Sequence, residues 1–231
     1  MVFKYDYKIK KSNIKIDRQK AFFQAKKMLP EYVFDTSQLE NNPISFPEVQ
    51  TLLDGISIGG HKLRDVEQVL NIKNTWLMLL EKIINNKFEV TKQMFNEVNE
   101  NIAKNEALEW GHFRTGKVCI AGTKTYVAPD FKDLDEIFDK EIDLILTGFN
   151  PIEQAIRIFL WGALNQFYWD GNKRTARIMA NGILISSGIG VFNIKATDIL
   201  EFNRLMIDFY DNKNASDIVK FLFEKCIKYI D

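Results

Sequence analysis

The chain has 231 residues, of which 46% are hydrophobic and 27% charged, and lysine plus arginine equals aspartate plus glutamate at 31 each. This composition is typical of one well-buried globular domain, and a formal net charge of zero argues against bulk nucleic-acid binding. Two cysteines, Cys119 and Cys226, are too few for a disulfide framework or a zinc site. Because no apolar stretch could span a membrane and no signal peptide is visible, we expect a protein of the reducing cytoplasm, with no nucleic-acid or membrane partner.

The first part of the chain predicts an arm followed by short helices. The expected elements are a strand or ordered arm over residues 1–16, a helix over 17–29 ended by Pro30, a loop over 31–47 and a short helix over 48–53. We therefore expect residues 1–47 to form an N-terminal arm and helix that pack on a helical domain of residues 48–231.

Helical periodicity dominates the remainder of the chain. The expected helices cover residues 63–85, 91–105, 135–147, 151–168, 174–187, 197–210 and 216–230. The fourth of these has a strong start, with Asn150 as N-cap, Pro151 in the first position and Glu153 in the third, a capping-box arrangement. The helix over 174–187 is apolar on nearly every side and is expected to be buried at the centre.

One segment departs from the helical pattern. Residues 117–127 place β-favouring side chains on both sides of Ala121-Gly122-Thr123-Lys124, which predicts a β-hairpin closed by Pro129. The fold class is therefore all-α with one hairpin.

The most informative segment lies between the two apolar helices, over residues 166–177. Gly171 and Asn172 can turn successive amide groups toward one point, and the N-terminus of the following helix points at the same place. Asp170, just before them, could hold a divalent cation that bridges phosphate oxygens. Cationic side chains gather in the same place: Lys173, Arg174 and Arg177. The segment predicts a polyphosphate site, and the alternative is an ordinary Asp-Gly-Asn turn before a helix with solvated basic residues.

The order of residues in this segment, QFYWDGNKRTAR, resembles the signature of the Fic/Doc family of cell filamentation (Fic-like) proteins. That signature is His-x-Phe-x-Asp/Glu-Gly-Asn-Gly-or-Lys-Arg, with a second arginine three residues on. The family's phenylalanine falls on Tyr168 and its histidine on Gln166, and no shift of register restores the histidine. The resemblance covers roughly residues 54–187 and implies a Fic-fold helical bundle, in which two central helices flank the signature loop and a β-hairpin flap lies nearby.

The chemistry implied by the resemblance is transfer of AMP from ATP to a protein Ser, Thr or Tyr hydroxyl, with Mg²⁺. Asp170 would hold the metal, Arg174 the β-phosphate and Arg177 the terminal phosphate. The residues implied in nucleotide binding are Gly171, Asn172, Lys173, Arg174 and Arg177.

The catalytic position is where this chain departs from the family. The family histidine is a general base, and the amide of Gln166 is not basic at neutral pH, so transfer should fall by about 10²–10⁴-fold. Three functions stay open: a degenerate or weak adenylyltransferase, a catalytically inactive pseudoenzyme that binds nucleotide or a partner, and a Doc-like phosphotransferase, which Lys173 resembles.

The resemblance also implies a docking surface and an autoinhibitory element. The flap would pair with an extended segment of the target protein through Lys117, Val118, Ile120, Tyr126 and Val127. The family's inhibitory element is Ser/Thr-x-x-x-Glu-Gly/Asn, and residues 50–55 occupy a comparable place with Asp54 at the glutamate position; the alternative is a helix end closed by Asp-Gly. A second copy of the chain or a small antitoxin-like protein is a further candidate partner.

Overall fold

Two helices, α7 (Pro151–Asn165) and α8 (Asn172–Ser186), form the centre of the fold in the computed structural model, which describes residues 3–10 and 13–230. Both are buried on nearly every side, which confirms the expectation of a buried central helix for the second of them. They approach closely because Gly162 faces Ala176: a Cβ added at Gly162 would lie 2.8 Å from the Ala176 Cβ. This pair positions the signature loop, residues 166–171, which joins them.

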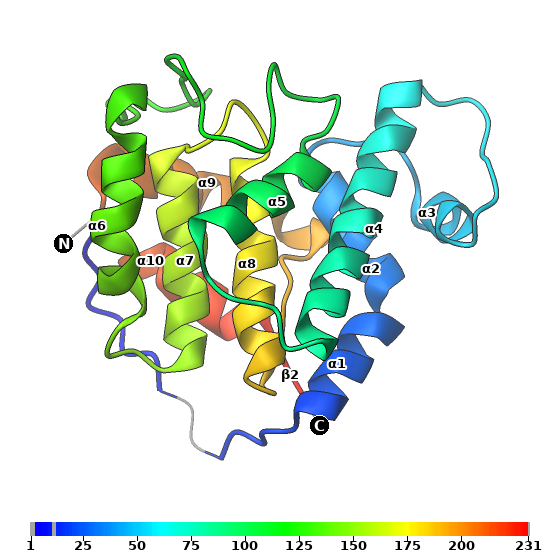
Figure 1. Cartoon of the computed structure of the whole chain (residues 1–231), viewed down its shortest axis with the longest axis horizontal. Helices are drawn as coiled ribbons and strands as arrows, with labels where there is room; N and C mark the ends of the chain where they lie inside the picture. Colours follow the sequence, from blue (N-terminus) through cyan, green and yellow to red (C-terminus); the bar gives the residue numbers. More distant parts are fainter. Residues whose placement is uncertain (1–2, 11–12, 231) are drawn as a thin grey trace.

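Other helices pack around this pair, whereas α3 (Phe46–Leu53) lies apart at the edge of the molecule (Figure 1). Helix α5 (Lys92–Ile102) and helix α4 (Leu63–Ile84) contact α8, and α6 (Leu134–Leu146) packs on α7. The remaining helical elements are α1 (Arg18–Lys27), α2 (Leu29–Gln38), η1 (Phe131–Asp133), η2 (Ala196–Asp198), α9 (Ile199–Asn212), α10 (Ser216–Phe221) and the π-helical turn η3 (Leu222–Cys226).

The starts of two expected helices, those over residues 91–105 and 151–168, are confirmed by their caps. The Thr91 hydroxyl accepts the Met94 amide at 3.1 Å, and the Asn150 carboxamide accepts the amides of Ile152 and Glu153 at 3.1 Å each. The reciprocal half of the predicted capping box is absent, because the Glu153 carboxylate accepts the hydroxyl of Tyr5 from the N-terminal arm instead.

A single two-stranded antiparallel sheet accompanies the helices in the described residues, so the expected fold class is confirmed, but its strands are not in residues 117–127. They are β1 (Gly190–Phe192) and β2 (Ile227–Tyr229), with Val191 opposite Lys228. Residues 117–127 form a loop with a turn in which the Thr123 amide donates to the Ile120 carbonyl at 3.4 Å. The predicted hairpin fails because the amides of residues 124–126 donate to the Asp211 carboxylate of α9, and not across to the other limb.

Two further predictions were wrong at element boundaries. Pro30 does not end a helix before a loop; it lies in the first turn of α2, where its missing N–H costs no hydrogen bond. The predicted C-terminal helix stops at Cys226, where the chain turns into β2. In the arm, Lys4 bridges to Asn214, and part of the expected strand falls on residues 1–2 and 11–12, outside the described residues. The division at residue 47 stays a prediction.

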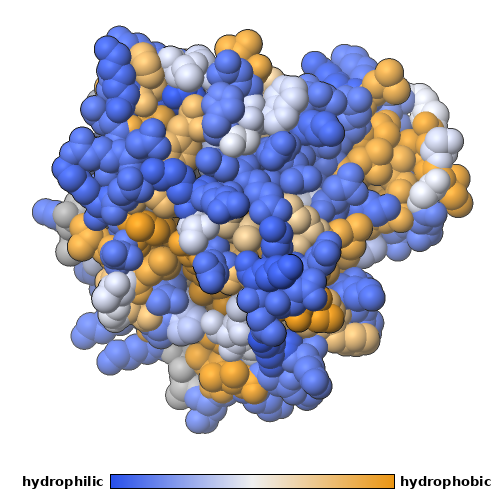
Figure 2. Space-filling view, viewed as in Figure 1, coloured by the Kyte–Doolittle hydropathy of each residue, from blue (hydrophilic) through white to orange (hydrophobic). Residues whose placement is uncertain are grey.

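The molecular surface is mostly hydrophilic on the face shown in Figure 2, with apolar residues gathered over α3 and the turn after it. Ile56 and Leu63 are 60% and 81% exposed there. Among the residues that the structure describes, no helix combines the length and apolarity needed to cross a bilayer.

Candidate active site

Two left-handed residues define the signature loop. Gln166 ends α7 with φ 49° and ψ 55°, and Gly171 begins α8 with φ 74°. Glycine is needed at the second position for its backbone angle and for space, because an added Cβ would lie 3.1 Å from the Ala103 Cβ. No side chain caps the first turn of α8, so the positive end of this helix faces the loop.

The backbone of the loop is held by hydrogen bonds to its carbonyl groups. The Arg114 guanidinium donates to the Gln166 carbonyl at 2.6 Å, and the Arg114 amide donates to the Phe167 carbonyl at 2.8 Å. Farther along, the side chain of Asn172 donates to the Tyr168 carbonyl at 2.8 Å, and buried Asn99 of α5 donates to the Asp170 carbonyl at 3.0 Å. The shape of the loop is thus fixed by neighbours as well as by its own sequence.

A pocket of about 320 Å³ opens above this loop. Its lining combines the signature loop with side chains distant in sequence: Glu40, Cys119, Ile120, Gln166, Trp169, Asp170, Gly171, Asn172, Lys173, Arg174 and Tyr210. The structure therefore brings together the predicted loop residues other than Arg177, which does not line the pocket, and one predicted flap residue, Ile120. The volume lies at the low end of the range of small-molecule sites.

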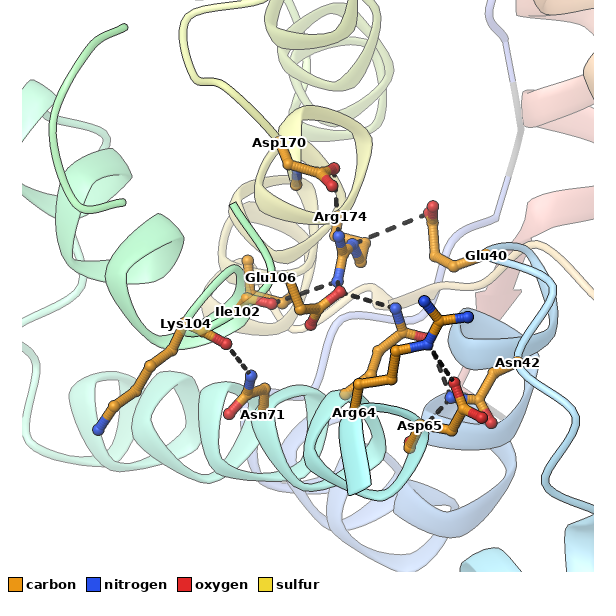
Figure 3. A network of polar contacts seen from close by, with 12 residues as sticks. Glu40, Asn42, Arg64, Asp65, Asn71, Ile102, Lys104, Glu106, Asp170 and Arg174 are labelled. Atoms are coloured by element: carbon orange, nitrogen blue, oxygen red, sulfur yellow. Dashed lines mark hydrogen bonds and ion pairs between the residues drawn. The ribbon is translucent and has the colours of Figure 1, made fainter. Parts of the chain in front are cut away.

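Arg174 lines this pocket and is only 2% exposed. Its Nη1 lies 2.8 Å from a Glu106 carboxylate oxygen, its Nη2 3.3 Å from Asp170, and its Nε 3.9 Å from Glu40. Figure 3 shows these three carboxylates around the guanidinium. Burial opposes the charge of Arg174, but Glu40, Glu106 and Asp170 outweigh that effect and raise its pKa.

Arg177 lies one turn further along α8 and is also buried, but it has few partners. Its Nη1 donates to the Thr36 hydroxyl at 3.1 Å, while its Nε and Nη2 have no hydrogen-bond partner in the described part of the chain. Burial lowers its pKa to about 10, and Glu40 acts in the opposite direction, so Arg177 stays protonated at neutral pH.

The carboxamide of Gln166 is engaged by the protein. Its Nε2 donates to the Ala163 carbonyl at 2.7 Å, and its Oε1 accepts the Asn172 side chain at 3.2 Å. Neither contact supplies a group that could accept a proton at neutral pH.

The family model described as Fic/DOC matches residues 85–184. Residues 85–184 form a Fic/DOC-family domain. Protein adenylyltransferase fic-1 of Caenorhabditis elegans is 28% identical over 162 residues, which make up 68% of this chain and 32% of that relative. The chain therefore spans about a third of the length of the curated relatives it matches.

Solved structures show the same fold. A Fic-domain-containing signalling protein from Bacteroides thetaiotaomicron has a TM-score of 0.72 at 17% identity, covering 90% of this chain and 84% of its own. A fragment of Fic-1 from C. elegans has a TM-score of 0.72 at 22% identity, covering 92% and 64%. IbpAFic2, solved covalently tethered to Cdc42, has a TM-score of 0.55 at 16% identity, covering 93% and 64%.

The segment that reaches the signature arginines is not the one predicted for autoinhibition in this Fic domain. Asp54 lies at the exposed C-terminal end of α3 and forms no ion pair with Arg174 in the described residues, whereas Glu40, just after α2, does. Thr36, Glu40 and Asn41 reproduce the Ser/Thr-x-x-x-Glu-Gly/Asn spacing without a departure. This motif is therefore a signal present in the sequence itself, within the segment 31–47 for which a loop is expected.

The other predicted site residues fall in two places. Lys173 is partly exposed at the start of α8, and Asp170 is exposed; no group of three or more acidic, histidine or cysteine side chains that could hold a metal occurs among the described residues. The remaining predicted flap residues line a separate groove of about 420 Å³ within the loop: Lys117, Val118, Tyr126 and Val127. We keep the name flap for residues 117–127.

Proposed function

We propose that this chain is a Fic-type nucleotidyl-transfer domain that binds ATP–Mg²⁺ at the signature loop, with transfer of AMP to protein hydroxyls weakened by the loss of the general base. The observation that carries the proposal is the pocket itself, in which the uncapped N-terminus of α8 meets Lys173 and Arg174. Amides at a helix start combined with fixed cations form a site for phosphate groups.

Unpartnered buried atoms in the pocket lining, and on Arg177 one turn further along α8, fit a polyphosphate. Arg177 Nε and Nη2, Arg174 Nε and the Tyr210 hydroxyl have no hydrogen-bond partner in the described structure. The 3.9 Å separation between Arg174 Nε and Glu40 is an ion pair and is too long for a hydrogen bond. Buried donors of this kind are costly unless a ligand or water accepts from them, and phosphate oxygens are suitable acceptors.

Asp170 is the residue that would hold Mg²⁺. A single protein carboxylate beside a phosphate site suits this ion, which keeps most of its water and shares phosphate oxygens as ligands. When bound, ATP would supply the nucleotidyl group, and Mg²⁺ would help to neutralise charge on the leaving pyrophosphate. The protein contributes Arg174, Arg177 and the α8 amides, which bind and orient the phosphates and balance charge that develops on them.

Gln166 occupies the position at which a general base would assist the transfer step. Its carboxamide is hydrogen-bonded within the protein and is not basic at neutral pH, so it cannot take the proton of a target hydroxyl. This observation favours a second candidate function, an inactive Fic pseudoenzyme that binds nucleotide or a partner protein.

Glu40 is the proposed inhibitory residue, in place of Asp54. Its carboxylate lies beside Arg174 and attracts Arg177, so it occupies space and charge that an ATP phosphate would need. The proposed partner is a target protein whose extended segment docks on the flap; IbpAFic2, which shares the fold, was solved tethered to the protein Cdc42.

The test is incubation of the chain and of Gln166→His with ATP labelled at the α or the γ phosphate, alone and with cell lysate. We expect Gln166→His to raise α-label transfer at least about tenfold, because a base at this position is worth about 10²–10⁴-fold. Label from the γ phosphate alone would instead indicate a Doc-like phosphotransferase. An unchanged rate in a variant that still binds ATP would leave the pseudoenzyme as the function.

A matched binding experiment tests the site itself. We expect the double variant Arg174→Ala, Arg177→Ala to lose the thermal stabilisation that ATP–Mg²⁺ gives the parent chain, since a ligand that binds only the folded state raises its stability. A double variant that ATP stabilises as much as the parent would place the nucleotide elsewhere.

A further inference from the structure

We propose that Arg114 is a positioning residue that fixes the flap to the signature loop and so sets where a docked target lies relative to residue 166. The proposal deepens the proposed function, on which the docking role of the flap rests. Arg114 lies just before the flap and outside the signature, so no motif in the sequence marks it.

The Arg114 guanidinium joins three main-chain carbonyl groups that are distant from one another in sequence. Its Nε donates to Gln166, its Nη1 to Gly116 and its Nη2 to Pro129, each at 2.6 Å. Gly116 and Pro129 flank the two ends of the flap, and Gln166 occupies the position of the family base. One planar group thus fixes both ends of the flap and one end of the signature loop.

The charge of Arg114 is buried and is held by hydrogen bonds to carbonyl groups. Arg114 is 2% exposed, and in the part of the chain that the structure describes it forms no ion pair with a carboxylate. Burial lowers its pKa, with Tyr126 and Asp130 acting in the opposite direction. A buried cation without a carboxylate depends on its hydrogen-bond acceptors, so displacing any of the three carbonyls would be costly.

Other contacts hold the flap in the same place. A Cβ added at Gly116 would lie 2.5 Å from the ring of Trp169, so one end of the flap packs directly on the signature loop. On the other limb, the Tyr126 hydroxyl donates to the Leu164 carbonyl near the end of α7, and Asp211 of α9 accepts the amide of Thr125 at 2.8 Å. Arg114 is the group that connects these two sides with the backbone of Gln166.

The chain offers a matched control for the loss of such a group. Arg157 is also buried and also donates to main-chain carbonyls, those of Ile145 at 3.0 Å and Leu144 at 3.1 Å, but it contacts neither the flap nor the signature loop. Arg114→Lys and Arg157→Lys both keep the charge and lose the planar fork. A difference between the two variants therefore reflects the contacts of Arg114 with the flap and the signature loop, and not the loss of a buried guanidinium in general.

The first measurement follows the flap directly, by amide hydrogen exchange of residues 117–127 and by alkylation of Cys119, which is exposed whereas Cys226 is buried. In Arg114→Lys we expect exchange in the flap to become at least about tenfold faster, because one charge-assisted hydrogen bond is equivalent to about that factor. Arg157→Lys should leave flap exchange and Cys119 alkylation within about twofold of the parent chain. Equal flap exchange in the two variants would overturn the proposal.

The second measurement separates positioning from folding. In a Gln166→His background, α-label transfer from ATP to the protein itself is measured against ATP concentration. Adding Arg114→Lys should lower the maximal rate at least about tenfold while half-saturating ATP stays within about twofold, because the phosphate site does not include Arg114. An unchanged maximal rate, or a loss confined to ATP affinity, would overturn the positioning role. If Gln166→His itself transfers nothing, the proposed function is wrong, and flap exchange alone decides whether Arg114 holds the flap.

Discussion

The competition between Glu40 and phosphate for Arg174 gives a prediction that can be worked through from the structure. Glu40→Gln keeps the shape of the side chain and removes its charge, which lies 3.9 Å from the Arg174 Nε. At an effective dielectric constant of about 20, an attraction at this distance is about 4 kcal/mol. Glu106 and Asp170 remain beside Arg174 in the variant, and a bound phosphate loses its own hydration, so only part of this energy can appear as affinity.

We expect Glu40→Gln to bind ATP–Mg²⁺ at least about tenfold more tightly than the parent chain, a gain of about 1.4 kcal/mol. Calorimetric titration at low ionic strength measures the dissociation constant directly. Asp54→Asn is the matched control, because residue 54 was the inhibitory candidate predicted from sequence and it forms no ion pair with Arg174 among the described residues. Equal affinity in Glu40→Gln and the parent, or a gain in Asp54→Asn, would refute the assignment of Glu40.

Two further predictions concern stability and pH. Gly182→Ala should lower the free energy of unfolding by about 1–3 kcal/mol in a denaturant titration, because its Cβ would lie 2.0 Å from the Phe88 ring; a change under about 0.5 kcal/mol would show that the ring moves aside. The amide of Thr125, followed by the other flap amides, lowers the pKa of Asp211 below its ordinary 3.8, so the contact between flap and α9 is fully present above pH 3.8 and is lost as the pH falls through the lower folded value. Hydrogen exchange at residues 124–126 should therefore rise more steeply below pH 3.8 than that of the α7 amides. Asp211→Ala should show the faster exchange already at pH 7. Flap exchange that responds neither to the fall in pH nor to Asp211→Ala would contradict this contact.

The phosphate side of the site could be predicted from sequence because its residues are nearly consecutive. Asp170, Gly171 and Arg174 follow one another across a loop and a helix start, and local backbone preferences bring them together. The caps at Thr91 and Asn150 could be predicted for the same reason, since a cap forms within a few residues of its helix.

The form of the flap could not be predicted in this way. Its β-favouring residues suggest a hairpin, but its amides find a carboxylate acceptor on α9, 85–87 residues away in sequence. Arg114 is similar, because the carbonyls that its guanidinium binds are 2, 15 and 52 residues away in sequence. Such long-range acceptors leave no periodic pattern. The Glu40 segment differs, because its motif is complete in the sequence. Pro30 predicts a helix end there, whereas it lies in the first turn of α2, the helix that positions this motif.

The backbone of Gln166 limits which residues can replace it during evolution. Its carbonyl carries the bond from Arg114, and its φ of 49° lies in a region that asparagine, aspartate and histidine enter more readily than most residues. A residue that replaces Gln166 must therefore be able to adopt this left-handed backbone conformation, whatever the chemistry of its side chain. Because the loop is held mainly through its carbonyl groups, we expect histidine at residue 166 to leave its shape unchanged, so that one substitution separates an amide from a base at this position.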